Sequence, residues 1–266
     1  MSFVALAAFC GMAQGQSIGI DWFGGNGTGD QTQMLPAEIA GVVPQGNWNS
    51  FLGTTGTMPL VLGSGASSGA TVTWGGSPND WDTNVDQTLS ANHKMMLGYL
   101  DTNDTSITNL MVSGLPASLT GPGYNVFIYY DGDNGTAGAV GSHRAGRFEL
   151  NGVSQWGRDA GNRFDGAFVQ GQTLIDPAPG MSGTQLDNQA AAVATVPAGN
   201  FMIFSGLTGG SFTLNVQASV SGSATNRASL NGMQIVAIPE PTSVALFAVG
   251  ALGGLGLLLR RRLRRA

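Results

Sequence analysis

The amino-acid sequence predicts an all-β body, an antiparallel β-sandwich of the jelly-roll type, followed by one C-terminal transmembrane helix. Glycine makes up 42 of the 266 residues, roughly twice its average share of ~7%. The glycines separate short runs rich in aromatic and β-branched residues, which is typical of strands joined by turns. Helical periodicity is not interleaved with these runs, which argues against a parallel α/β sheet. Residues 242–259 carry no charge, which predicts the helix.

The body is expected to span residues 16–237 and to contain about nine strands, each bounded by glycine, proline or asparagine turn signals. A blade repeat of roughly 40–50 residues, which a β-propeller needs, is not present. The expected strands are Ser17–Phe23, Thr71–Trp74, Lys94–Leu100, Ser106–Val112, Tyr124–Tyr130, Arg144–Leu150, Phe201–Leu207, Ser211–Val220 and Ser229–Ile238. One short helix is expected at Pro36–Val42, and residues 159–194 are expected to form a long loop or an insertion.

The C-terminal 28 residues combine three features in a fixed order: a Pro-Glu-Pro motif, an apolar span and an arginine cluster. Pro239 and Pro241 flank Glu240, and because neither proline has an amide hydrogen to donate, the sandwich must end near Ile238. As a helix, residues 242–259 would span about 27 Å, close to the ~30 Å of a hydrocarbon core. The cluster consists of Arg260, Arg261, Arg262, Arg264 and Arg265. An excess of arginine marks the cytoplasmic side, so the body is expected to lie outside the cytoplasm.

This order of features resembles the PEP-CTERM sorting tail of Gram-negative bacteria. In that family an integral-membrane enzyme, exosortase, recognises the tail and processes it near the motif. The resemblance implies that Pro239, Glu240 and Pro241 form the recognition motif, and that exosortase is a partner of this protein. It also implies transfer from the inner membrane to the cell surface, in bacteria that often make exopolysaccharide and biofilm. An ordinary single-pass anchor is the alternative.

The N-terminus is expected to be a signal peptide, residues 1–15. It contains an apolar run with the single cysteine, Cys10, and ends in small residues that suit cleavage after Gly15. Neither lysine nor arginine precedes the run, so either the signal is atypical or the natural start lies further upstream. A buried first strand or helix is the alternative. After cleavage the mature chain would have no cysteine and therefore no disulfide.

The body also resembles the galactose-binding-like jelly rolls of PEP-CTERM proteins. The similar segments are IGIDWFGGNG at 18–27, AEIAGVVPQGNWNS at 37–50, YNVFIYYDGDNG at 124–135 and SLNGMQIV at 229–236. This resemblance implies the fold and leaves the ligand open.

The charge of the body and the motifs that it lacks argue against several classes of function. Before Arg260 there are six basic and sixteen acidic residues, a net charge of −10, which argues against nucleic-acid binding. The sequence has no HExxH helix motif and no nucleophilic cysteine in the body. We therefore expect a non-enzymatic structural or adhesive protein of the cell surface or extracellular matrix, with a secreted hydrolase as a less favoured alternative.

Calcium is the one cofactor that the sequence suggests. Calcium binds six to eight oxygens, and carboxylates and amides in glycine-rich loops supply them. The candidate ligands are Asp80, Asp82, Asn84, Asp86, Asp131 and Asp133. None of these clusters matches an EF-hand loop, and the alternative is that the side chains stabilise turns through bonds to their own backbone.

Carbohydrate binding is the second functional hypothesis, with extracellular polysaccharide as the ligand. Sugar sites use aromatic faces together with a few polar groups. Trp81, Tyr129 and Tyr130 are the candidates, and Trp81 is the one most expected to be exposed because it lies between two aspartates. The alternative is that these aromatic side chains belong to the core.

Overall fold

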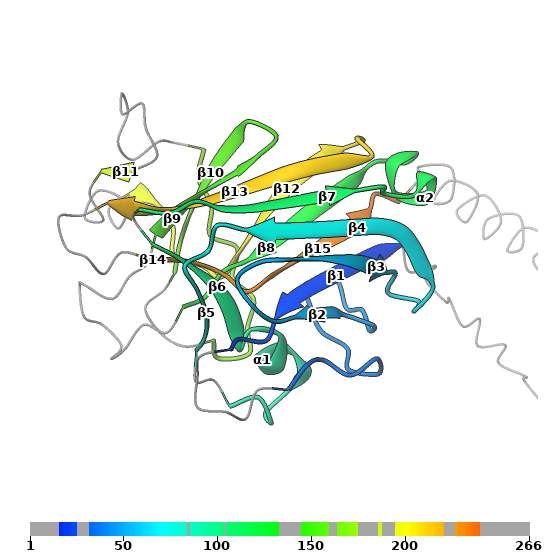
Figure 1. The fold of residues 1–266 in the computed structure, drawn as a ribbon, viewed down its shortest axis with the longest axis horizontal. Coiled ribbons are helices and arrows are strands. Elements are labelled where there is room, and N and C mark those ends of the chain that lie inside the picture. The colour runs from blue at the N-terminus through cyan, green and yellow to red at the C-terminus, as the bar shows by residue number, and fades with distance from the viewer. Residues whose placement is uncertain are drawn as a thin grey trace, which may run out of the picture.

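Two β-sheets packed face to face form the body of the protein (Figure 1). The computed structural model describes residues 16–25, 32–83, 86–103, 105–132, 145–159, 164–174, 186–187, 195–220 and 227–239. The expected signal peptide, the apolar span 242–259 and the arginine cluster lie outside these residues.

The first sheet has the strand order β12-β8-β15-β1-β2. Its strands are β12 (Phe201–Leu207), β8 (Tyr124–Tyr129), β15 (Gly232–Ala237), β1 (Ser17–Trp22) and β2 (Asn49–Phe51). All neighbours pair antiparallel except β1 and β2, which are parallel. The first and last strands of the body are therefore direct neighbours near the middle of one sheet.

The second sheet has the order β10-β9-β13-β7-β4-β3. These strands are β10 (Val153–Arg158), β9 (Ala145–Leu150), β13 (Ser211–Val220), β7 (Thr108–Ser113), β4 (Ser67–Gly75) and β3 (Gly56–Val61). The short β11 (Leu186–Asp187) pairs parallel with β13. The two parallel pairs correct the prediction of a purely antiparallel sandwich.

A small third sheet, β14-β6-β5, closes one end of the sandwich. It consists of β14 (Arg227–Leu230), β6 (Gly98–Asn103) and β5 (Asn79–Asp82). Two short helices complete the described elements, α1 (Ala91–Met95) and α2 (Ala117–Thr120).

The main core lies between the two large sheets and follows the period of two that strands impose. Ile18, Ile20 and Trp22 of β1 are 0% exposed and face this core. Trp22 contacts Trp74 of β4 edge to face at 6.2 Å between ring centroids, and Phe51 of β2 stacks on Trp74 at 5.0 Å. This aromatic cluster joins the two sheets at the end where β1 and β2 terminate.

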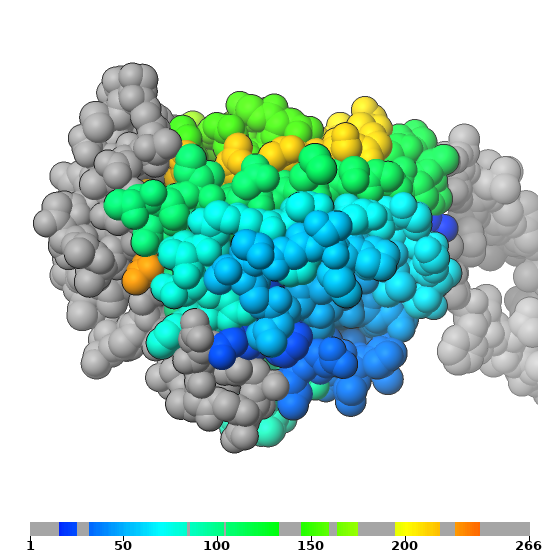
Figure 2. Space-filling view, viewed as in Figure 1, coloured from blue at the N-terminus to red at the C-terminus, as the bar shows by residue number. Residues whose placement is uncertain are grey.

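The outer faces of the two sheets differ. The first sheet is covered by a second cluster of buried side chains that includes Met34, Trp48, Met95 and Phe164. All six residues of β1 are consequently buried. The second sheet has an open outer face, where Met111 of β7 is 45% exposed. Figure 2 shows β3 and β4, in blue to cyan, lying on the surface of the molecule.

Two sequence predictions were wrong in the region that covers the first sheet. Residues 36–42 form turns and a bridge between Ala40 and Gln45, not a helix. Residues 94–100 begin as α1, not as a strand, because the Ser90 side chain accepts a hydrogen bond from the His93 amide and caps the helix. The strand starts only at Gly98.

The strand predicted at Ser229–Ile238 is two strands in different sheets, separated by Asn231. The fully buried Asn231 side chain accepts from the Asp131 amide at 2.6 Å and donates to the Met96 carbonyl at 3.0 Å. These two bonds hold the chain where it changes sheets. The sequence also did not predict β2, β3, β5, β10 and β11. β2 and β11 have only three and two residues, β3 contains Pro59, and β5 and β10 have few apolar residues.

Candidate functional site

The point where the C-terminal tail leaves the body is defined by backbone hydrogen bonds. β15 lies between β1 and β8, with Ala237 paired to Tyr124 and Val236 to Ser17. The Ile238 amide donates the last bond, to the Gly123 carbonyl at 2.8 Å. Pro239 follows and has no amide hydrogen to donate. Within the described part of the chain, the hydrogen-bonded sheets therefore extend to Ile238, next to the position where the prolines predict the end of the sandwich.

The N-terminal end of the body lies beside this point. Gln16 accepts a hydrogen bond from the Ala237 amide at 2.9 Å, and its side chain accepts from the Ser118 hydroxyl of α2. The start of β1 and the end of β15 are thus adjacent to α2 (Figure 1). Both termini of the folded body leave it at the same end of the sandwich.

Most of the predicted sorting residues lie beyond the described part of the chain. Pro239 is the last described residue, and Glu240, Pro241 and the arginines at 260–265 lie outside it. In the described ranges no helix has the length and apolar character needed to cross a membrane. The predicted span at 242–259 is not among them.

Asp80 and Asp82 lie on the same side of β5 and are 3% and 1% exposed. Burial raises the pKa of the Asp80 carboxyl. The backbone amides of Gly53 and Gly25 donate to this carboxylate and partly oppose the increase. Asp80 thereby ties β5 to the turn that follows β2. The calcium hypothesis had placed these two aspartates in a loop, and the structure places them in a strand.

The other calcium candidates are separate from this pair or lie outside the described residues. The Asp86 carboxylate accepts from the hydroxyl and amide of Thr88 at 2.6 and 2.9 Å, and these bonds lower its pKa. Asp131 is buried at the end of β8. Asn84 and Asp133 are not described. Within the described ranges, no three His, Cys, Asp or Glu side chains are grouped so that they could hold a metal ion.

The two tyrosines proposed to contact sugar lie in the interior. Tyr129 and Tyr130 are 0% and 2% exposed, and burial raises the pKa of both phenols. The Tyr129 hydroxyl donates to Gln234 and accepts from the Val42 amide, each at 2.9 Å. The Tyr130 hydroxyl donates to the Gly171 carbonyl. Both hold surface segments onto the first sheet and present no ring face to solvent.

Trp81 differs from the other four tryptophans of the chain. It is 38% exposed on β5, whereas Trp22, Trp48, Trp74 and Trp156 are at most 5% exposed. The exposed side chain alternates with the buried Asp80 and Asp82, so the strand geometry directs it away from them. Of the three aromatic candidates, Trp81 alone is accessible to a ligand.

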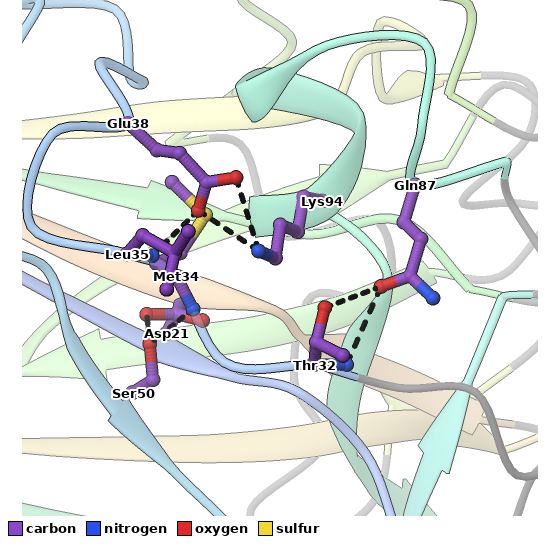
Figure 3. Close-up of polar contacts among 8 residues, drawn as sticks. All are labelled: Asp21, Thr32, Met34, Leu35, Glu38, Ser50, Gln87 and Lys94. Atoms are coloured by element: carbon purple, nitrogen blue, oxygen red, sulfur yellow. Dashed lines mark hydrogen bonds and ion pairs between the residues drawn. The ribbon is translucent and has the colours of Figure 1, made fainter.

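A buried polar cluster on the outer side of β1 was not predicted from the sequence (Figure 3). The Ser50 hydroxyl donates to the Asp21 carboxylate at 2.8 Å, and the Met34 amide donates to the Ser50 oxygen at 3.0 Å. Complete burial raises the pKa of Asp21 to about 7, against the opposing effects of Ser50 and the positive charge of Lys94. An acidic residue inside the apolar segment SIGIDWF was the available signal.

Lys94, the single lysine of the chain, forms the second half of this cluster. Its ammonium group contacts both carboxylate oxygens of Glu38, at 2.9 and 3.0 Å. Burial opposes ionisation of Glu38, but the Leu35 amide and Lys94 outweigh it, so the pKa of Glu38 is lowered. Figure 3 shows that these contacts, with the Thr32–Gln87 bonds, fasten residues 32–38 to α1 and the sheet. The arrangement stabilises the cover of the first sheet.

The fold and the tail junction define a class: a β-sandwich-like body whose last strand leads directly into a C-terminal extension. A family model of the PEP-CTERM protein-sorting motif matches residues 237–262, so the chain carries this motif. The motif implies export and sorting to the cell surface by an exosortase, which is a membrane enzyme. Neither the curated proteins nor the solved structures contain a match to this chain.

Proposed function

We propose that this protein is anchored in the inner membrane by residues 242–259, processed near the Pro239-Glu240-Pro241 motif, and then acts as a non-enzymatic component of the cell surface or extracellular matrix. One observation carries the proposal. The hydrogen-bonded body ends at Ile238, directly before the motif, so the motif belongs to no strand of the described sheets. A recognition motif that follows the last hydrogen-bonded strand in the sequence would be accessible to a processing enzyme without unfolding of the body.

The sandwich is, in this proposal, a jelly roll. The chain passes repeatedly from one large sheet to the other, and its first and last strands are neighbours in the first sheet. This arrangement supports the resemblance to galactose-binding-like domains. An experimental structure with a different order of strands would contradict it.

The test of processing is intact-mass analysis of the mature protein from its native host. Glu240→Gln removes the charge between the two prolines, and we expect unprocessed precursor to accumulate in the membrane. Asp165→Asn, which removes an exposed carboxylate of the body, is the matched control and should be processed normally. A mature protein that keeps the arginine tail, or normal release of the Glu240 variant, would contradict the proposal.

Carbohydrate binding by the body is a second candidate function, supported by the exposed ring of Trp81. Aromatic rings stack on sugar faces, and the neighbouring polar loops would supply hydrogen bonds. Retention of the wild-type protein on extracellular polysaccharide, lost in Trp81→Ala but kept in Leu89→Ala, is the expected result. Leu89 is 66% exposed and serves as a matched apolar control. Equal retention of both variants would contradict this function.

Calcium dependence of the body is proposed only for the turn that begins at Asp131. A ligand of the native state must raise the thermal midpoint of unfolding. The measurement is thermal unfolding of the purified protein with calcium and with a chelator. An unchanged midpoint would rule out a calcium site of the native state, and the aspartates would then be turn residues alone.

A further inference from the structure

The end of the sandwich from which the tail leaves, here called the tail end, has a distinctive composition. It is built from turns that meet around the two termini of the body. The Gly63 amide donates to Ser17 at 2.8 Å, and the Leu115 amide donates to Gly210 at 3.0 Å. The tail end consists of residues 16, 62–66, 114–123, 151–152, 208–210 and 238–239. None of these residues is Asp, Glu, Lys, Arg or His.

The opposite end of the sandwich carries the acidic residues. β1, β2 and β8 terminate there, and the third sheet covers it. Asp80, Asp101 and Asp131 lie in or beside the strands of this end, and Asp101 forms an ion pair with Arg227 at 3.4 Å. Among the described residues, the ionisable side chains thus lie along the sheets or at the opposite end. The uncharged tail end and the end that contains these carboxylates therefore lie at opposite ends of the sandwich.

The tail leaves little distance between the body and a membrane. Three residues, 239–241, separate Ile238 from the uncharged span 242–259. Four residue steps of at most ~3.5 Å allow no more than about 14 Å between Ile238 and the start of the span. As a helix the span is about 27 Å long, which is already shorter than the ~30 Å core. None of its residues can therefore lengthen the connection to the body. The headgroup layer, roughly 5–8 Å thick on each side, occupies much of the remaining distance.

We infer that the tail end is a membrane-facing surface, which lies against the lipid headgroups while the span holds the protein in the bilayer. This inference rests on the proposed membrane anchoring. Anionic headgroups repel carboxylates within a Debye length of about 8 Å, a distance that includes the tail end. The tail end adds no charge to that of Glu240 in the linker, so the folded body itself contributes no repulsion there, and the carboxylates of the opposite end lie away from the bilayer. The partner of this surface is a lipid headgroup layer.

Single-cysteine probes on the full chain test this orientation. Cys10→Ser removes the single native thiol. Ala66→Cys, Ala117→Cys and Thr208→Cys place a fluorophore at exposed positions of the tail end, and Leu52→Cys and Thr105→Cys place it at exposed positions of the opposite end. The protein is reconstituted in vesicles of phosphatidylcholine with a minor fraction of phosphatidylglycerol and headgroup-labelled quencher lipid. We expect severalfold stronger quenching at the tail end.

Equal quenching of both sets in vesicle-bound protein would overturn the inference. Flotation of the vesicles separates this outcome from failure of the proposed function: protein that does not float with lipid shows that the span is no anchor. Ala117→Glu is expected to reduce quenching at position 66 in vesicles with phosphatidylglycerol and not in pure phosphatidylcholine, whereas Thr105→Glu changes neither. If Ala117→Glu slows processing in cells but leaves quenching unchanged, the tail end faces the sorting enzyme and the lipid assignment is wrong.

Discussion

The tail end and the opposite end of the sandwich are built from the same strands but from different connections. At the tail end, short glycine-rich turns join β3 to β4, β9 to β10 and β12 to β13, and the two termini of the body lie side by side. At the opposite end, the described residues include buried carboxylates and the buried Asn231. One end is suited to carry the tail close to a surface, and the other has the polar groups that fix the packing of the body. In the proposed function, the tail end serves sorting, whereas the opposite end stabilises the body.

The largest expected loss of stability follows from a change in the aromatic cluster of Trp22, Phe51 and Trp74 at the opposite end. Trp22 is 0% exposed and contacts both Phe51 and Trp74. Trp22→Ala should lower the free energy of unfolding by about 3–5 kcal/mol, because it removes a large buried ring and leaves a cavity. Denaturant unfolding measures this loss. Met111→Ala, on the open face of the second sheet, is the control and should cost less than ~1 kcal/mol. Similar losses for both would mean that the core does not concentrate at this end.

The next effect concerns the polar support of the opposite end. Asn231→Ala leaves the Asp131 amide and the Met96 carbonyl without their buried partner. Each unsatisfied buried group costs roughly 1–3 kcal/mol, so for the two groups together we expect a loss of about 2–6 kcal/mol. Asn151→Gly, in the exposed turn of the tail end, removes a bond to the Thr213 amide and, because glycine tolerates the positive φ of this position, should cost no more than about 1 kcal/mol. If the Asn151 variant is the less stable of the two, the division between the ends is wrong.

The pH dependence of stability tests the buried cluster around Asp21. The folded-state pKa of Asp21 is raised from 3.8 to about 7, so the folded protein keeps a proton that the unfolded chain has lost. The contribution of Asp21 is therefore largest below pH 4 and declines as the pH rises toward 7. Between pH 5 and 7 we expect this group to reduce the free energy of unfolding by about 2 kcal/mol. Asp21→Asn should remove that decline, and an unchanged slope would contradict the assignment.

The smallest effect is expected at the tail end itself. Ala117→Glu and Thr208→Asp add a charge to exposed positions without buried contacts. Their effect on the free energy of unfolding should stay within ~0.5 kcal/mol. Thermal unfolding of the purified protein measures it. A large loss would show that the lack of charge serves folding and would remove the reason to assign it to membrane proximity.

Much of the fold follows from local patterns. β1, β8, β12 and β13 begin and end within one residue of their predicted limits, because each combines alternating or continuous apolar residues with clear turn signals. The errors have local causes that compete with these patterns. The cap at Ser90 turns an apolar run into a helix, and the buried Asn231 divides a run that looks like one long strand. β5 was missed because the residues NDWD are typical of turns.

The candidate site was predictable only where its signal is local. The sorting motif was found because prolines, charge and apolar length carry their meaning in the sequence itself, and the family model matches at the same place. The tyrosines were proposed as ligand contacts, although Tyr129 is fully buried under residues 41–43 and Phe168. Composition cannot separate a core aromatic residue from an exposed one when both faces of a strand are covered.

The sequence by itself located the sorting motif of the tail, and it predicts where the last strand stops, which stretch spans a bilayer and which side the arginines occupy. These depend on properties of consecutive residues, namely the missing amide hydrogens of proline, hydropathy and charge. Tertiary structure alone decided that Asp21 and Lys94 are buried in one cluster, and that turns from four parts of the chain form an uncharged end. The buried cluster and the uncharged end both depend on pairing between strands that are far apart in the sequence, such as β1 with β15. The register of such a pair has no signal in the local sequence.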